Sequence, residues 1–259
     1  MIIDFHMHFH PGQGRIEDLL AAMDANGVDM AALSAVVRPG TDGPAAQAHI
    51  HKTTKAHPTR LIGMACVVPY EEGAASLLEK YVTEFGFRGL KLVPSVQHFL
   101  PSDPRIFPVV QKCIALDIPI LIHTTAVPVP GTRSRNDDPF EVDDIALAFP
   151  EAKLVIAHGD PFGPAPAIAG KHPNVYMDTT TTFARYARLI PGLGEDTLKN
   201  MGLVSGISGS YKTLFGSDTN PLKTHRLQEN IDPIRALKIP DDEKARILGG
   251  NAAHLLKLS

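Results

Sequence analysis

Two histidines near the N-terminus have the spacing of a metal-binding pair. His6 and His8 are separated by one residue and follow the apolar residues Ile2 and Ile3. Side chains alternate between the two faces of a β-strand, so His6 and His8 would point the same way in an extended segment. Two imidazoles one strand step apart can chelate a single metal ion. Among 12 histidines such a pair also arises by chance, so a metal site requires further ligands elsewhere in the chain.

The elements that would position such ligands follow a repeating order, in which short runs rich in Ile, Val and Leu alternate with segments of helical periodicity. The predicted strands cover 2–8, 28–37, 61–68, 87–93, 119–123, 153–158, 174–178 and 213–218. The predicted helices cover 15–26, 44–56, 71–85, 103–116, 139–149, 164–171, 222–237 and 241–256, and 184–208 has no clear assignment.

These strands are continuous apolar runs, which indicates burial on both faces and a parallel sheet. Eight consecutive βα units predict an α/β protein, a single-domain (β/α)8 TIM barrel over residues 1–259. A doubly wound open sheet is the alternative. It would have fewer strands and usually a Gly-rich loop after the first one, where this chain has histidines.

Polar residues stand at the ends of several predicted strands. The active site of a (β/α)8 barrel lies at the carboxyl ends of its strands, so residues at these positions are expected to converge. They are His6 and His8 on the first strand, Lys91 on the fourth, and His123, His158, Asp178 and Asp218 on the fifth to eighth. This clustering is much harder to obtain by chance than a His-x-His pair.

The residue types predict metal chemistry. Neutral imidazoles and a carboxylate suit Zn²⁺ and its first-row neighbours, and three histidines with one aspartate leave a position open for water. Water bound there loses a proton near neutral pH and becomes a nucleophile. Asp218 can touch the metal and accept that proton as a general base. A further histidine can polarise the substrate or act as an acid.

Six ordered motifs, spread over essentially the whole chain, resemble a known superfamily. They are His6-Met7-His8, Gly89-Leu90-Lys91-Leu92, Ile122-His123-Thr124, Ile156-Ala157-His158, Phe215-Gly216-Ser217-Asp218 and Gly250-Asn251-Ala252-Ala253. The sequence resembles the amidohydrolase superfamily, in its amidohydrolase-related (type 2) branch. The resemblance implies that His6, His8, His123 and Asp218 are metal ligands. It also implies that His158 is a catalytic or second-metal histidine.

The resemblance implies a metal-dependent hydrolase that activates a metal-bound water to cleave a C–N or C–O bond of a small substrate. The alternative is a metal-dependent decarboxylase, a lyase acting on a small carboxylic acid, although such relatives tend to be longer. A TatD-type deoxyribonuclease is third, because that family has a glutamate ligand in a Gly-Glu context where this chain reads Gly89-Leu90-Lys91. A barrel kept only for binding is the non-enzymatic alternative.

The number of metal ions depends on Lys91. In some barrels of the superfamily a lysine on the fourth strand is carboxylated and bridges two ions, and His123 and His158 would then bind the second one. One firmly bound divalent ion, with zinc favoured by the ligand types, is the preferred expectation. Lys91 would in that case place its ammonium against a substrate carboxylate or a neighbouring aspartate.

Two loops carry candidate substrate-binding residues. The loop 124–138 contains Arg133 and Arg135, and loops of this length at a catalytic face are commonly functional. A guanidinium there could grip a carboxylate or phosphate of a small anionic substrate, and a solvated loop arginine is the equal alternative. His98, in the loop after the fourth strand, could line the pocket or lie on the surface. His10 is expected at the rim of the site.

Composition excludes several classes of protein. The 259 residues are 44% hydrophobic and 20% charged, ordinary for a soluble globular protein with a sizeable core, and the net charge of −3 argues against a nucleic-acid partner. No run approaches the roughly 18 apolar residues of a membrane span, and no signal peptide is visible, so a cytoplasmic protein is expected. Cys66 and Cys113 lie in apolar runs and are predicted to be buried free thiols. The sequence does not determine whether the protein is a monomer or a homo-oligomer.

Overall fold

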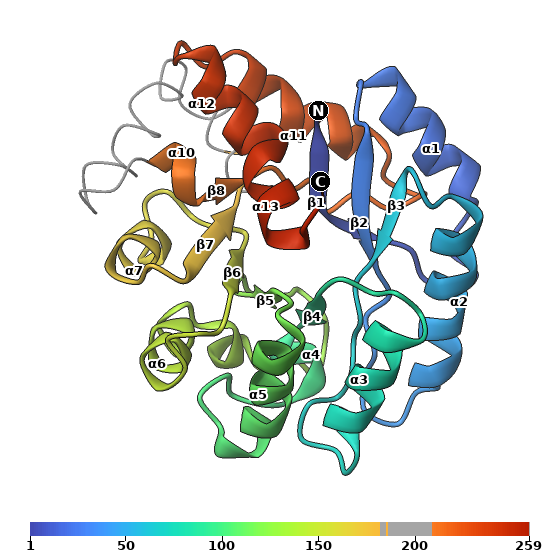
Figure 1. The fold of residues 1–259 in the computed structure, drawn as a ribbon, viewed down its shortest axis with the longest axis vertical. Helices are drawn as coiled ribbons and strands as arrows, with labels where there is room; N and C mark the ends of the chain where they lie inside the picture. Colours follow the sequence, from blue (N-terminus) through green and yellow to red (C-terminus); the bar gives the residue numbers. More distant parts are fainter. Residues whose placement is uncertain (182–184, 186–208, 259) are drawn as a thin grey trace.

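Eight short apolar segments form the strands of the protein in a computed structural model, which describes residues 1–181, 185 and 209–258. The strands form a ring with helices around it, seen end-on in Figure 1. They are β1 (Ile3–His8), β2 (Met30–Ser34), β3 (Leu61–Gly63), β4 (Leu90–Leu92), β5 (Ile120–His123), β6 (Leu154–Ala157), β7 (Val175–Asp178) and β8 (Thr213–Leu214).

The strands pair in parallel and in chain order, within one group from β1 to β3 and another from β4 to β8. Both seams between the groups are bridged. Ala65, just after β3, pairs with Leu90 of β4, and Met7 of β1 pairs with Thr219, beyond β8. The amide of Phe5 also donates to the carbonyl oxygen of Phe215 at 2.9 Å. These contacts close the ring and confirm the predicted (β/α)8 barrel over the open sheet.

The outer helices are α1 (Ile16–Ala25), α2 (Gly43–Ala56), α3 (Ala74–Thr83), α5 (Phe107–Leu116), α6 (Phe140–Ala148), α7 (Ala165–Lys171) and α11 (His225–Arg235). The shorter elements are α4 (Pro94–Gln97), α10 (Gly209–Lys212), η1 (Pro104–Ile106) and η2 (Ser134–Asp137). The segment 184–208, which the sequence leaves unassigned, lies outside the described residues except for residue 185. In the part of the chain that the structure describes, no helix has the length and apolar character of a membrane span.

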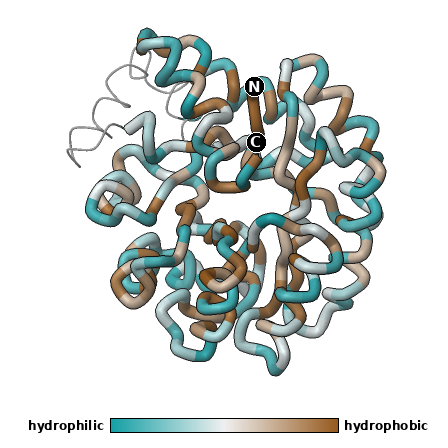
Figure 2. The backbone as a smooth tube through the Cα atoms, viewed as in Figure 1, coloured by the Kyte–Doolittle hydropathy of each residue, from teal (hydrophilic) through white to brown (hydrophobic). Residues whose placement is uncertain are grey.

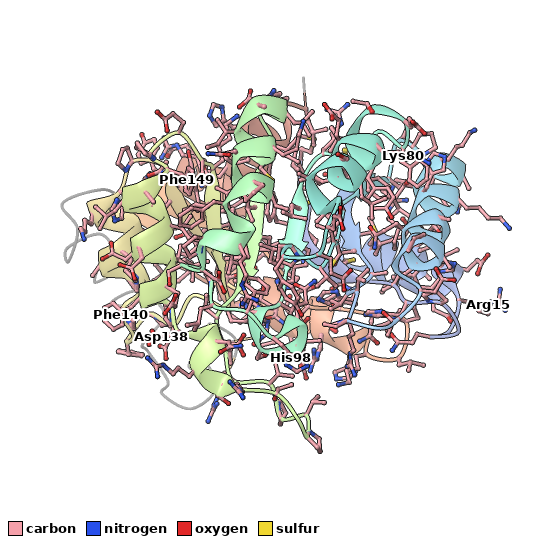
Figure 3. The ribbon with its side chains drawn as sticks, turned by 90° about the horizontal axis from the view of Figure 1, so that it is seen from below. Arg15, Lys80, His98, Asp138, Phe140 and Phe149 are labelled. Atoms are coloured by element: carbon pink, nitrogen blue, oxygen red, sulfur yellow. The ribbon has the colours of Figure 1, made fainter. Side chains whose placement is uncertain are left out.

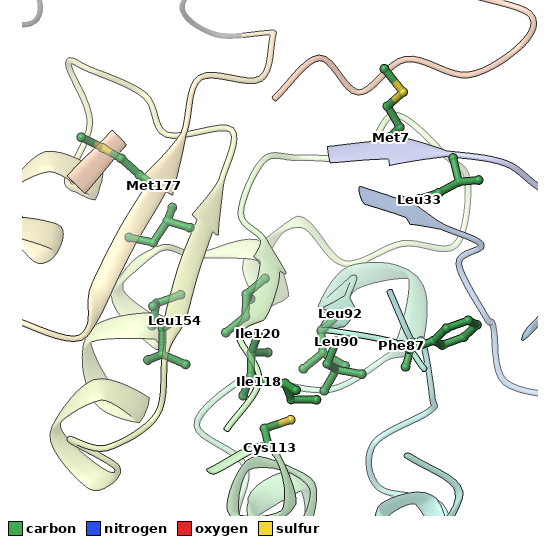
Figure 4. Close-up of a cluster of buried hydrophobic side chains, with 14 of the residues drawn as sticks. Met7, Leu33, Phe87, Leu90, Leu92, Cys113, Ile118, Ile120, Leu154 and Met177 are labelled. Carbon is green, nitrogen blue, oxygen red and sulfur yellow. The ribbon is translucent and has the colours of Figure 1, made fainter. Parts of the chain in front are cut away.

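The two faces of the strands contribute to different hydrophobic clusters. On β5, Ile120 and Ile122 pack in a cluster that includes Leu19 of α1 and Val109 of α5, whereas Leu121 belongs to a second cluster. The first cluster therefore lies between strands and helices (Figure 4), and the second fills the barrel interior. Figure 2 shows the most hydrophobic stretches in the ring of strands. Cys66 and Cys113 are both buried and free, as predicted.

Four strands are at most half as long as the apolar runs predict. The runs 28–37, 61–68, 87–93 and 213–218 contain strands of only five, three, three and two residues. Beyond the assigned strands the pairing becomes irregular. The amide of Cys66 donates to the side-chain oxygen of Gln47 at 3.0 Å, whereas that of Asp218 donates to the carbonyl oxygen of His6 at 2.8 Å, across the seam between β8 and β1. Apolar composition therefore extends past the ladder because these connecting segments are buried as well.

The predicted final helix 241–256 is interrupted. It consists of α12 (Asp241–Ala245), a π-helical turn η3 (Arg246–Gly250) and α13 (Asn251–Leu256). The carbonyl oxygen of Ile247, in the π turn, accepts a hydrogen bond from the amide of Phe215, just after β8, at 2.8 Å. Buried α13 residues then join the inner cluster of the barrel, so this helix closes one end of the interior.

Candidate active site and metal centre

Three side chains from the two ends of the chain meet at the carboxyl end of the barrel. The Nε2 atoms of His6 and His8 lie 3.2 Å apart, and Asp218 Oδ1 lies 3.2 Å from His8 Nε2 and 3.9 Å from His6 Nε2. One donor atom from each residue falls within 4.8 Å of the other two. Two imidazole nitrogens and a carboxylate oxygen at such spacing are a donor set that a divalent transition metal accepts.

An irregularity in β1 turns both histidines toward the barrel mouth. The pairing of β1 with β2 shifts register between Asp4 and Met7. Phe5 packs in the inner cluster, so strict alternation from Phe5 would turn His6 toward the helices. The shift instead lets Met7 pack in the outer cluster while His6 and His8 both face the barrel mouth. A bulge of this kind commonly re-aims a side chain beside an active site.

The second nitrogen of each histidine is held in place. His6 Nδ1 lies 2.8 Å from Asp178 Oδ2 and 3.2 Å from the hydroxyl oxygen of Thr180. His8 Nδ1 lies 3.0 Å from the hydroxyl oxygen of Ser34. A proton on His6 Nδ1 donates to the carboxylate of Asp178 and leaves the Nε2 lone pair facing the centre. Metal-binding histidines are oriented by the same kind of outer contact.

Asp218 is fixed by Arg226 of α11. The guanidinium Nη1 of Arg226 donates to Asp218 Oδ2 at 2.6 Å and to the backbone oxygen of Asp218 at 3.1 Å. Burial raises the pKa of Asp218, but the hydrogen bond with His8 and the charges of His8 and His6 outweigh it and hold that pKa well below its usual range. Asp218 is therefore a carboxylate at neutral pH, with Oδ1 turned toward the histidines.

Lys91 lies directly behind the donor set. Its neighbours on β4, Leu90 and Leu92, pack in the outer cluster, so alternation turns Lys91 into the barrel. The side chain is fully buried, and Nζ lies 2.9 Å from His6 Nε2. Burial lowers the pKa of Lys91 to about 8, against the opposing effect of the carboxylates of Asp178 and Asp218. Most of the amine is still protonated at neutral pH.

His123 and His158 form a second pair beside the donor set. His158 Nε2 lies 3.0 Å from His123 Nδ1, and His123 Nε2 lies 2.5 Å from the backbone oxygen of Thr125. Burial, then the charge of His6, lowers the pKa of His158 to about 4. Burial, then the charge of His158, holds the pKa of His123 well below its usual range. Both rings are neutral near pH 7. In the described residues His123 is not within the 4.8 Å group, so its role as a ligand stays a prediction.

A cavity of about 550 Å³ opens in front of the donor set. Its inner end is formed by His8, Lys91, His123 and Asp218. Its walls include Val36, Val93, Val96 and Val127, and its outer end includes His10 and Arg38. This volume suits a small ligand. His158 borders a second cavity of about 290 Å³ together with Arg185.

The predicted substrate-binding residues of the loops lie elsewhere. Arg133 and Arg135 are exposed and do not line the 550 Å³ cavity. His98 is also exposed, in a left-handed conformation (φ 61°) after α4, and Figure 3 shows it at the same end of the molecule as Asp138. The η2 turn sets this position, because the amide of Ser95 donates to a carboxylate oxygen of Asp137 at 3.0 Å and draws the buried end of the loop toward α4.

Two arginines of the site escaped the sequence analysis. Arg38 directly follows the predicted strand 28–37, so the rule that polar residues at strand ends reach the active site could have found it. Arg226 lies within a predicted helix, eight residues after Asp218, and no sequence signal distinguishes it from a solvated helical arginine. His10, expected at the rim, does line the outer end of the cavity.

Known proteins resemble this chain in sequence and in fold. A 2-keto-4-carboxy-3-hexenedioate hydratase from Sphingobium sp. strain SYK-6 is 25% identical over 200 residues, which are 67% of this chain and only 58% of that relative's length. A 4-oxalomesaconate hydratase structure from Rhodopseudomonas palustris is 21% identical, with a TM-score of 0.70 over 99% of this chain and 96% of that one. A dihydroxybenzoic acid decarboxylase structure from Polaromonas sp. JS666, with bound manganese and the inhibitor 2-nitroresorcinol, is 18% identical, with a TM-score of 0.75 over 99% and 97% of the two chains.

The match to a family model is nearly complete. The model described as Amidohydrolase aligns with residues 3–258, from the first residue of β1 to the end of the C-terminal helix region. These similar proteins include two hydratases and a decarboxylase, which catalyse different reactions. With its closed (β/α)8 barrel and this alignment over almost every residue, the chain belongs to the amidohydrolase family, in the amidohydrolase-related (type 2) branch that the sequence motifs predict.

Proposed function

We propose that the protein is a metal-dependent lyase that removes CO2 from a small carboxylic acid. The observation that carries the proposal is Lys91, a fully buried cation at the inner end of the cavity. Within the described residues Lys91 makes no ion pair, and its amine contacts His6 Nε2. A buried charge without a counterion is costly, so an anionic ligand is the partner that this position favours.

The metal and Lys91 compete for the same lone pair. A metal ion held by His6 Nε2, His8 Nε2 and Asp218 Oδ1 would occupy the nitrogen that Lys91 contacts in the described structure. The ammonium of Lys91 would then be released to a substrate carboxylate at the same end of the cavity. This supports one ion with Lys91 as a substrate-binding residue over a carboxylated Lys91 with a second ion on His123 and His158.

The donor chemistry fits the metal. Two imidazole nitrogens and one carboxylate oxygen suit zinc and manganese, and a manganese ion is bound in the decarboxylase structure from Polaromonas. A divalent ion there would act as a Lewis acid on a bound oxygen. We propose one such ion, with His6, His8 and Asp218 as ligands and His123 as a further candidate.

The proposed reaction breaks the bond between the carboxylate carbon and the substrate carbon. The electron pair stays on the substrate carbon, which takes up a proton, and CO2 leaves. We assign that proton to the ammonium of Lys91, which is protonated at neutral pH at the inner end of the cavity, and the amine regains a proton from solvent after CO2 leaves. Lys91 would hold the carboxylate in place until the bond breaks.

Water addition or hydrolysis is the second candidate. The relative from Sphingobium is a hydratase. The ionised carboxylate of Asp218, a member of the donor set, would serve as a general base for water. The hydrolysis of a C–N or C–O bond, as predicted from the sequence, would use the same group.

The test is a substrate panel on protein loaded with Zn²⁺ or Mn²⁺. The panel contains hydroxybenzoic acids and unsaturated dicarboxylic acids, with small lactones and amides for hydrolysis, and CO2 release is followed together with ultraviolet absorbance. We expect the wild type to release CO2 from a carboxylic acid only when the metal is bound. We expect Lys91→Met to release none. Lactone or amide cleavage without CO2 would favour the hydrolase. Absence of any metal-dependent turnover, in protein shown to bind the ion, would overturn the proposal.

A further inference from the structure

The outer end of the cavity carries a cation without an acidic partner. Arg38 follows β2 in the connection to α2 and lines the same 550 Å³ cavity as Lys91. Its backbone is held by Thr41, whose hydroxyl donates to the Arg38 carbonyl oxygen at 2.7 Å and accepts from the Arg38 amide at 3.2 Å. Over the ranges that the structure describes, the guanidinium of Arg38 has no hydrogen bond or ion pair. Its donors are therefore available to a ligand.

Besides Asp218, the acidic side chain that lines the cavity in the described part of the chain is Asp42, which is already engaged. Asp42 lines the cavity and is the N-terminal cap of α2, where Asp42 Oδ1 accepts from the amide of Ala45 at 2.9 Å. No ion pair within 4.0 Å joins Asp42 to Arg38 among the described residues. The helix cap explains Asp42 and leaves Arg38 without a structural role.

A stacked pair of histidines lines the cavity with Arg38. The ring of His10 stacks on that of His8, with centroids 6.0 Å apart and an angle of 22° between the planes. The charge of Arg38 acts on His10 in turn. Exposure rises from the buried Lys91 through half-buried His8 and His10 to the exposed Arg38. The cavity therefore runs from a buried cation to a cation at the mouth.

Four valines form an apolar part of the cavity wall. Val36, Val93, Val96 and Val127 line the cavity. Branched aliphatic side chains offer no hydrogen bonds and favour a hydrophobic ligand body. Arginine binds a carboxylate through two parallel hydrogen bonds, which a lysine cannot reproduce.

We propose that Arg38, which lines the cavity together with His10, forms a second acid-binding subsite, and that the substrate carries two acid groups joined by an apolar body. The first acid group is the one assigned to Lys91, so this inference rests on the proposed function for that assignment. The second group would meet Arg38 at the mouth and would not react. Arg38 thus sets the substrate class as dicarboxylic acids.

Binding of non-reacting probes tests the subsite without turnover. Dissociation constants of benzoate, isophthalate and terephthalate are measured by calorimetry on the metal-loaded protein at fixed ionic strength. We expect the better dicarboxylate to bind about tenfold or more tightly than benzoate, as a charge-assisted pair would provide. In Arg38→Gln the preference should fall to about twofold or less, while benzoate affinity is unchanged; Arg38→Lys should retain part of it.

Arg133→Gln is the matched control, because Arg133 is an exposed arginine of the loop after β5 and does not line the cavity. Its preference for dicarboxylates should equal that of the wild type. Metal content and melting temperature confirm that each variant is folded. Equal binding of benzoate and both dicarboxylates by the wild type would overturn the subsite, and so would a preference that survives in Arg38→Gln. A dicarboxylate preference in a protein that releases no CO2 would support the subsite while the proposed function fails.

Discussion

At the scale of single residues, each donor of the candidate metal centre has one atom aimed inward and another tied to a neighbour. Asp178 and Thr180 hold His6, Ser34 holds His8, and Arg226 holds Asp218. Side chains fixed in this way pay little rotamer entropy on binding an ion. Arg226 is the only charged member of this supporting set that is half-exposed, and it can be removed without opening the barrel core.

Removal of Arg226 should weaken metal binding. In Arg226→Ala the Asp218 carboxylate loses its 2.6 Å hydrogen bond and gains freedom to rotate. We expect the metal dissociation constant to rise about 10- to 100-fold, the usual effect of an outer-contact mutation, and Arg226→Lys to fall between. Competition with a chelating dye measures the constant. Lys223→Ala, an exposed cation just before the same helix, is the control, and an equal loss there would contradict the role of Arg226.

Lys91 should cost stability in the metal-free protein. Its pKa is about 8 in the folded barrel, against 10.5 in the unfolded chain. Below pH 8 the Lys91 amine is protonated in both the folded and the unfolded state, so burial of its charge lowers the free energy of unfolding by the full amount. Between pH 8 and 10.5 the unfolded state binds more protons than the folded state, so the free energy of unfolding rises with pH. Lys91→Met should therefore be more stable by up to about 3 kcal/mol at pH 7, and the difference should shrink toward pH 10.5.

Urea unfolding of the wild type and of Lys91→Met at pH 7, 9 and 10.5, after removal of metal, measures this difference. A constant difference across the three pH values would show that packing, and not the buried charge, separates the two proteins. The same substitution should abolish turnover, so the residue that destabilises the fold is the one that the proposed chemistry needs.

At the scale of elements, irregularities in regular structure position the site. The register shift in β1 turns His6 inward, and the π turn η3 offers the carbonyl oxygen of Ile247 to the amide of Phe215. The second contact anchors the segment that leads to Asp218. π turns inside helices are rare and often functional, and here the turn supplies the acceptor for the Phe215 amide.

Gly249 in the π turn is a direct test. A Cβ added there would lie 2.4 Å from the backbone oxygen of Met1, a contact that backbone movement alone can relieve. We expect Gly249→Ala to lower the free energy of unfolding by about 1–3 kcal/mol, as overpacking does. The adjacent Gly250→Ala is the matched control, since its Cβ would meet Ala245 oxygen at an ordinary 3.5 Å. Urea unfolding compares the two, and equal stabilities would contradict the close contact.

At the scale of the whole molecule, the metal centre joins the first strand to the last. His6 and His8 come from β1, and Asp218 follows β8, across the seam that the Met7–Thr219 pairing closes. An unfolded chain does not hold these donors together, so an ion that binds them stabilises only the folded barrel.

Metal removal should therefore lower the melting temperature. At a metal concentration 100 times the dissociation constant the stabilisation is about 2.7 kcal/mol. For a barrel of this size that corresponds to a shift of about 5–10 °C. Differential scanning calorimetry before and after dialysis against a chelator measures the shift. His6→Ala should melt at the same temperature with and without the ion, and a retained shift in that variant would place the stabilising ion elsewhere.

The sequence by itself determined the barrel and the identity of most residues at its mouth. Continuous apolar runs separated by helical segments are a local property, and the rule that strand ends converge then grouped His6, His8, Lys91, His123 and Asp218 at one face. The same rule applied to the end of the second strand would have added Arg38. These inferences succeed because they need only the order of elements along the chain.

The tertiary structure decided how those residues are arranged. The register shift in β1 depends on pairing with β2, and Lys91 meets His6 across 85 residues of chain. The Arg226–Asp218 contact depends on the path of the chain between β8 and α11. No local pattern encodes these arrangements. The loop arginines Arg133 and Arg135 were predicted from their position in the chain, yet the packing of η2 leaves them exposed. Side-chain direction is set by long-range packing, and for that reason the sequence predicts which residues reach the site but not what each of them contacts.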